Sequence, residues 1–187
     1  MNSESLKLYT VLLGGREEGY LFEQHKYFFC VAGSLEEVKV MAKEFWRSAI
    51  TLHIDAYMCL DQVCGHRVVI QDECNSFPIE DIDPNKKLFF VNLGGYYKNI
   101  FAEVHRQIFV IALDRVEAKK TAEKMFYFNH DLLLREKHCQ PHVDDIASID
   151  ELLSTKGYSI KLKQLHGYDH TSVYSRPEIV ITGFLKI

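Results

Sequence analysis

The chain has 187 residues, of which 47% are hydrophobic and 12% aromatic, and its formal net charge is −4. This apolar content excludes a disordered chain, and the acidic balance argues against a nucleic-acid or anionic-membrane partner, since either needs a basic face. No apolar run reaches the ~20 residues of a membrane helix, and the first residues lack a signal peptide's basic start. The five cysteines are odd in number and contain no Cys-x-x-Cys pair, which is typical of reduced thiols, so we expect a cytoplasmic protein.

An apolar segment at residues 7–13 predicts the first strand. Gly14 and Gly15 follow, and we interpret this pair as a turn that needs positive φ. A phosphate-binding loop is the alternative interpretation, but no helix follows directly. The next apolar segment, residues 25–32, predicts a second strand that is apolar on both faces, so we expect it to be covered on both.

A helix is predicted over residues 35–46. Ser34 and Glu37 have the spacing of a capping box, in which each side chain accepts from a free backbone N–H of the first turn. The helix carries one apolar stripe, so we expect that stripe to face a sheet. The stripe consists of Leu35, Val38, Met41, Ala42 and Phe45.

Two further strands are predicted at residues 52–60 and 66–71, on either side of a turn at Gly65. The unit is therefore β-β-α-β-β, which belongs to the α+β class with the helix on one face of the sheet.

The same unit occurs a second time. Residues 8–46 align without a gap on residues 88–126, and twelve of the thirty-nine pairs are identical, where chance gives about two or three. Residues 53–61 then align with 142–150 after an insertion of nine residues. We interpret this as a tandem duplication whose two repeats pack with pseudo-two-fold symmetry, because a unit of roughly 70 residues is marginal alone.

This interpretation divides the chain into four parts. They are a first repeat at 1–77, an acidic linker at 78–86, a second repeat at 87–164 with an inserted loop at 127–141, and a C-terminal extension at 165–187 that supplies one added strand.

Several stretches of both repeats resemble the two-copy form of a bacterial family, the domain of unknown function 1543. The resemblance covers residues 7–70 and 87–163 and rests on "KLYTVLLGGREEG", "EQHKYFFCVAGSLEEV", "LHIDAYMCLDQVCGHRVVI", "LFFVNLGGY" and "HVDD". It implies a duplicated bacterial protein and supplies no activity, so no catalytic residue is carried over.

Each repeat retains two polar pairs at a spacing of two, which on a strand places both side chains on one face. The pairs are Glu23 with His25, His53 with Asp55, Glu103 with His105, and His142 with Asp144. They could tie a turn to a neighbouring strand through hydrogen bonds, bind a divalent metal, or form an acid–base pair. We favour the first interpretation and expect no cofactor; in the second, the four histidines His25, His53, His105 and His142 are the candidate ligands.

The inserted loop adds His130, His138 and Cys139 close to His142, but their spacings match no zinc motif, which favours a polar surface loop. Cys64 and His66 near the turn do not by themselves make a nucleophile–base pair.

Aromatic residues flank the glycine pairs, and we expect them to be exposed. They are Tyr20, Phe22, Tyr96 and Tyr97. Two matched half-sites suit binding better than catalysis, which needs different groups around one reacting atom. We therefore expect a non-enzymatic module, monomeric or homodimeric, that binds a small ligand or a protein partner between the repeats or at the glycine pairs. The alternative is a metal-dependent or acid–base enzyme that uses the repeated pairs.

Overall fold

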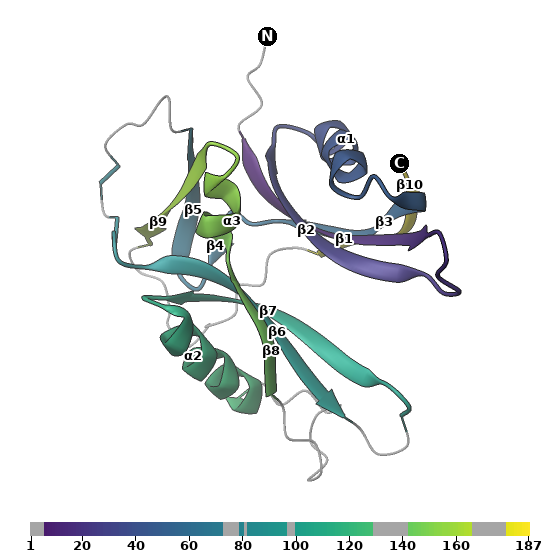
Figure 1. The fold of residues 1–187 in the computed structure, drawn as a ribbon. Coiled ribbons are helices and arrows are strands. Elements are labelled where there is room, and N and C mark those ends of the chain that lie inside the picture. The colour runs from purple at the N-terminus through teal and green to yellow at the C-terminus, as the bar shows by residue number, and fades with distance from the viewer. Residues whose placement is uncertain (1–5, 73–78, 81, 97–99, 129–141, 166–178) are drawn as a thin grey trace.

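The computed structural model describes residues 6–72, 79–80, 82–96, 100–128, 142–165 and 179–187 (Figure 1). Within these residues the fold is α+β, with three antiparallel sheets and three helices. In chain order the elements are β1 (Lys7–Glu17), β2 (Gln24–Ala32), α1 (Leu35–Phe45), β3 (Ala49–Cys59), β4 (Gln62–Val63), β5 (His66–Asp72), β6 (Lys87–Tyr96), β7 (Glu103–Ala112), α2 (Arg115–Phe128), β8 (His142–Ser148), α3 (Ile149–Ser154), β9 (Tyr158–Gln164) and β10 (Ile179–Lys186). None of the helices in this part of the chain has both the length and the apolar character that crossing a membrane requires.

The first sheet has the strand order β10-β3-β1-β2, so β1 is flanked by β2 and β3. Helix α1 packs on one face of this sheet, where Val38 and Ala42 are fully buried (Figure 1). The predicted apolar stripe is confirmed except at Phe45, which is half exposed and contacts Phe28 with its ring.

The cap predicted at Ser34 is confirmed, and α2 begins with a cap of the same kind at Asp114. Ser34 accepts a hydrogen bond from the Glu37 backbone N–H, and Asp114 accepts one from that of Glu117. The two glutamates accept from the residue before the cap, Gly33 and Leu113, rather than from the cap residue itself. The first backbone N–H groups of a helix have no carbonyl partner within the helix, and at both helices these side chains accept hydrogen bonds from such groups.

Glu17 ties the end of β1 to the end of α1. Its carboxylate accepts hydrogen bonds from Lys26 Nζ at 2.8 Å, from Ser48 Oγ at 2.9 Å and from the Trp46 indole N–H. These bonds lower the pKa of Glu17 from 4.5 to about 2, the Lys26 bond most of all. Lys26 also lies over the Trp46 ring, 4.1 Å from its centroid.

The second sheet has the order β7-β6-β8, and α2 covers its outer face. There Ala118 and Ala122 are buried against Phe89 and Val91.

The inner faces of the first and second sheets pack against each other. Leu8 and Val31 belong to the same apolar cluster as Leu88 and Phe90. The Phe90 ring lies 5.0 Å from that of Tyr27, measured between centroids. Strand β2 is therefore covered on both faces, as its apolar pattern predicted.

The third sheet has the strand order β4-β5-β9, so it combines two strands from residues 62–72 with one from residues 158–164. Strand β5 pairs with β9, with Val69 opposite Lys161. Helix α3, which precedes β9, is an element that the sequence pattern did not predict. Ser148 caps it, and Ile149 and Leu153, four residues apart, are fully buried.

The turn predicted at Gly14 and Gly15 is wrong. Both glycines lie inside β1, and neither has positive φ. The chain reverses further on, at Gly19, where φ is +84°. The predicted turn at Gly65 is confirmed, with φ of +74°.

Candidate functional site

The repeated polar pairs meet on the inner face of each sheet. In the first sheet Gly14 of β1 lies opposite His25 of β2 on one side and His53 of β3 on the other. The two histidines therefore come from strands that are not neighbours, and their side chains meet above the central strand. Glu23, just before β2, and Asp55 of β3 complete what we call the first cluster.

A β-bulge positions Asp55. Strand β1 pairs Leu13 with Ile54 and Leu12 with Ala56, which leaves Asp55 without a partner residue. Bulges redirect a side chain and are common beside functional sites.

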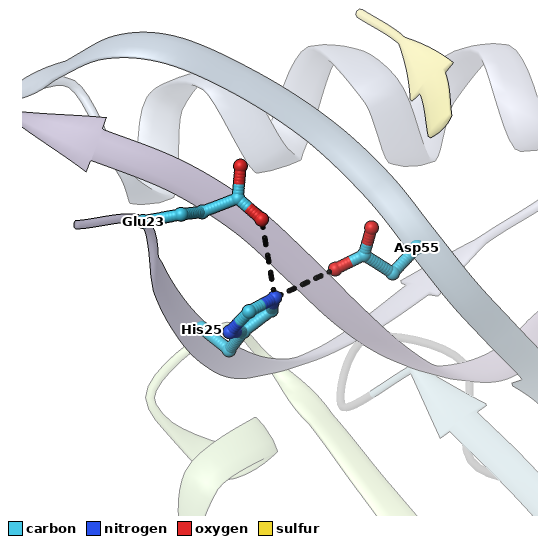
Figure 2. A group of neighbouring side chains, drawn as sticks. All are labelled: Glu23, His25 and Asp55. Atoms are coloured by element: carbon cyan, nitrogen blue, oxygen red, sulfur yellow. Dashed lines mark ion pairs between the residues drawn. The ribbon is translucent and has the colours of Figure 1, made fainter. Parts of the chain in front are cut away.

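The four side chains of the first cluster bring nitrogen and oxygen atoms together. Figure 2 shows three of them, Glu23, His25 and Asp55, with both carboxylates directed at the His25 ring. His25 Nε2 lies 3.3 Å from Glu23 Oε1 and 3.2 Å from Asp55 Oδ2. His53 Nε2 lies 3.7 Å from Glu23 Oε1 and 3.1 Å from Asp55 Oδ1. Each imidazole thus contacts both carboxylates through its Nε2 atom.

Glu103, His105, His142 and Asp144 form a second cluster in the second sheet. His105 Nε2 lies 3.6 Å from Glu103 Oε2 and 3.3 Å from Asp144 Oδ2. His142 Nε2 lies 3.0 Å from Glu103 Oε1 and 2.8 Å from Asp144 Oδ1. The structure therefore brings all eight residues of the predicted pairs into two groups of four.

The backbone of the second cluster follows the same pattern. Gly94 of β6 lies opposite both His105 and His142. The register of β6 with β8 shifts between Asn92 and Leu93, which leaves Asp144 as the bulged residue.

Gly14 and Gly94 provide the space that the clusters occupy. A Cβ atom on Gly14 would lie 2.8 Å from Asp55 Oδ2 and closer still to His53 Nε2. A Cβ atom on Gly94 would lie 2.7 Å from Glu103 Oε1 and closer still to an Asp144 oxygen. Only glycine leaves room for the four side chains, and this, rather than a turn, explains why the residue occurs at both positions.

Three polar atoms of the clusters are buried without a hydrogen-bond partner. They are His53 Nδ1, Asp55 Oδ2 and Glu103 Oε1. The two carboxylate oxygens are within ion-pair distance of an imidazole nitrogen, but the directions do not suit a hydrogen bond. An unsatisfied buried acceptor costs about 1–3 kcal/mol. In each cluster one carboxylate oxygen thus lies beside an imidazole nitrogen without a hydrogen bond to it.

The surroundings of the two clusters differ at one histidine. The His53 side chain is 3% exposed, because Phe184 of β10 stacks on its ring at 4.0 Å. Thr182 of the same strand donates hydrogen bonds to the Asp55 carbonyl, at 2.9 Å, and to the Ile54 carbonyl. His142 is 48% exposed.

Tyr96 borders the second cluster. Its ring stacks on His142 with the centroids 6.2 Å apart, and its hydroxyl shares a hydrogen bond with Glu103. The neighbouring Glu103 carboxylate, followed by burial and Asp144, raises the pKa of Tyr96. Tyr20 and Phe22 are exposed, as predicted, between β1 and β2. Tyr97 lies outside the described residues.

The other sequence candidates do not form a site in the described part of the chain. His130, His138 and Cys139 of the inserted loop lie outside it. His66 Nδ1 lies 2.9 Å from the backbone oxygen of Cys64, not from its thiol. Burial raises the pKa of that thiol, which argues against a nucleophile.

Sequence reasoning missed the part that Gly14 and Gly94 play. One signal was available in the sequence, because both glycine pairs recur together with the same histidines. The pattern of a single strand, however, does not show that the glycine lies beneath histidines from two other strands.

Comparison with known proteins supplies a domain and a fold but no activity. The family described as Domain of Unknown Function (DUF1543) matches residues 20–70. This segment contains the whole first cluster. No curated protein matches the chain.

Among solved structures, the chain is similar to the crystal structure of a protein Il1583 from Idiomarina loihiensis. The TM-score is 0.59 at 22% sequence identity, over 93% of each chain. This similarity establishes the fold alone.

Proposed function

We propose that this protein binds divalent transition-metal ions at two sites, the first and the second cluster. The observation that carries the proposal is the convergence, in both clusters, of two imidazole nitrogens and two carboxylates above a glycine. The ion is the small ligand of the binding module expected from the sequence, and its place is the inner face of each sheet rather than a glycine turn.

The distances between the ligand atoms fit a metal ion. Ligands about 2.1 Å from an ion stand roughly 3.4 Å apart in a tetrahedron and roughly 3.0 Å apart at neighbouring octahedral positions. The N–O distances run from 3.1 to 3.7 Å in the first cluster and from 2.8 to 3.6 Å in the second. In each cluster three groups also offer atoms within 4.8 Å of one another: Glu23, His25 and Asp55, and Glu103, His142 and Asp144.

The type of ligand narrows the choice of ion. Two carboxylates neutralise a divalent charge, and neutral imidazoles suit zinc, iron, nickel or copper. Calcium and magnesium prefer sets made of oxygen alone. A bound ion would also satisfy the buried oxygens Asp55 Oδ2 and Glu103 Oε1, which have no hydrogen-bond partner.

The test is metal analysis of protein purified without an affinity tag, together with zinc, manganese and nickel titrations of the metal-free protein. We expect two ions per chain and a rise in melting temperature, because a ligand that binds the folded state stabilises it. Asp55→Asn and Asp144→Asn should each remove one ion. Asp61→Asn, the same change at an exposed residue beyond β3, is the matched control. A chain that binds none of these ions, and whose melting temperature ignores them, would contradict the proposal.

We further infer that the two clusters derive from one ancestral β-β-α-β-β unit by tandem duplication. The same residue types at the same register around Gly14 and Gly94, with a bulge at Asp55 and at Asp144, support this inference. An experimental structure in which residues 8–46 and 88–126 do not superpose would contradict it.

A further inference from the structure

The two clusters differ in the type of residue that lies two positions beyond Gly14 and Gly94. In β6 this residue is Tyr96, which shares the face of Gly94 and contacts Glu103 and His142 of the second cluster. In β1 it is Arg16. Residues two apart on a strand lie on one face, and β1 keeps a regular register with β3 from Gly14 to Arg16. Arg16 therefore occupies, beside the first cluster, the position from which Tyr96 reaches the second.

The guanidinium of Arg16 is available to a ligand. The side chain is exposed, and in the described part of the chain it makes neither an ion pair nor a hydrogen bond. Glu17, the next residue, points to the other face, where it binds Lys26 and Trp46. A metal ion would balance the two carboxylates of the first cluster, and Arg16 forms no ion pair with another described residue, so its positive charge is left to attract an anion.

Solvent reaches the first cluster from the side of β2. The side chains of His25 and Glu23 are 51% and 44% exposed, whereas His53 on the other side is covered by Phe184. A metal bound here has room for an additional ligand on the exposed side. Arginine binds carboxylates and phosphates through paired N–H groups, and these anions are also good ligands of a divalent metal.

We propose that the metal-loaded first cluster binds an oxyanion, a carboxylate or a phosphate, with one oxygen on the metal and another on the Arg16 guanidinium. The second cluster lacks this function, because Tyr96 is neutral and its hydroxyl is engaged with Glu103. This inference rests on the proposed metal binding and specifies the ligand class of one of the two sites.

The experiment is calorimetric titration of the full-length, zinc-loaded protein with inorganic phosphate and, separately, with acetate. We expect one anion per chain, bound by the first cluster, so that the second-cluster variant Asp144→Asn retains it. Arg16→Gln should weaken the preferred anion at least about tenfold while the metal content stays at two ions. Arg47→Gln removes the same charge from an exposed residue beyond α1, outside both clusters, and should leave the affinity unchanged.

The outcomes separate the two proposals. If no metal binds, the proposed function itself fails. If two metal ions bind but neither anion does, or if Arg16→Gln binds the anion as tightly as the unmodified protein, the oxyanion inference is overturned. Tighter binding of phosphate or of acetate identifies which of the two anions the site accepts. If Arg16→Lys retains part of the anion affinity, this would support a role for the positive charge of Arg16.

Discussion

Replacing Gly14 by alanine tests the candidate metal site with a single methyl group. The new Cβ atom would lie 2.8 Å from Asp55 Oδ2 and closer still to His53 Nε2. An ordinary contact is about 3.4 Å or more, so the Asp55 oxygen must retreat by at least about 0.6 Å. Metal–ligand distances tolerate only about ±0.2 Å. At least one of the two ligands should therefore be lost, and zinc affinity of the first cluster should fall about 100-fold, or roughly 2.7 kcal/mol.

The assay is a zinc titration by calorimetry in a chain that also carries Asp144→Asn, so that only the first cluster is observed. Alanine suits a strand better than glycine, and the metal-free variant should therefore keep its fold, which circular dichroism checks. Gly94→Ala, paired with Asp55→Asn, is the matched experiment on the second cluster. An unchanged zinc affinity in both variants would refute the reasoning, because the ligands could not then lie above the glycines.

Three further predictions concern one residue beside the first cluster, one in the core between the sheets and one at the end of β1. Phe184→Ala should expose His53 and weaken zinc binding at the first cluster about tenfold, leaving the second unchanged; equal effects on both in the same titration would refute this. Phe90→Ala should lower the free energy of unfolding by about 3–5 kcal/mol, measured with urea, because its ring fills the core between the two sheets; a loss below about 1 kcal/mol would contradict that packing. Glu17→Gln should lower the melting temperature at neutral pH, and the difference from the unmodified protein should shrink as the pH falls from 4.5 towards about 2. A carboxylate whose pKa is lower in the folded state stabilises the fold at pH values above its unfolded-state pKa, and this stabilisation is lost as the pH falls through the folded-state pKa. A difference in melting temperature that does not depend on pH would contradict this.

Local chemistry made several elements predictable. Ser34 with Glu37, and Asp114 with Glu117, mark where each long helix begins, because their side chains accept from the first turn's free donors. The apolar pattern of residues 25–32 indicated a strand covered on both faces. These signals depend on near neighbours along the chain, and the structure confirmed them. Helix α3 escaped prediction because its six residues are too few for a periodic pattern and its stability comes from the burial of Ile149 and Leu153.

The glycine pair shows where local reasoning failed. A Gly-Gly sequence is typical of a turn, but Gly14 continues a strand. The reason lies in side chains 11 and 39 residues further along, His25 and His53, which need the space above it.

The sequence alone determined which residues are candidates for a site, because the Glu-x-His and His-x-Asp spacings place each pair on one face of a strand. The tertiary structure decided that those pairs meet. Strands β2 and β3 pair with opposite edges of β1, and a bulge at Asp55 directs that carboxylate towards the same point. Strand pairing is a long-range interaction, so neither residue spacing nor composition could reveal that four side chains from separate strands surround one point above a glycine.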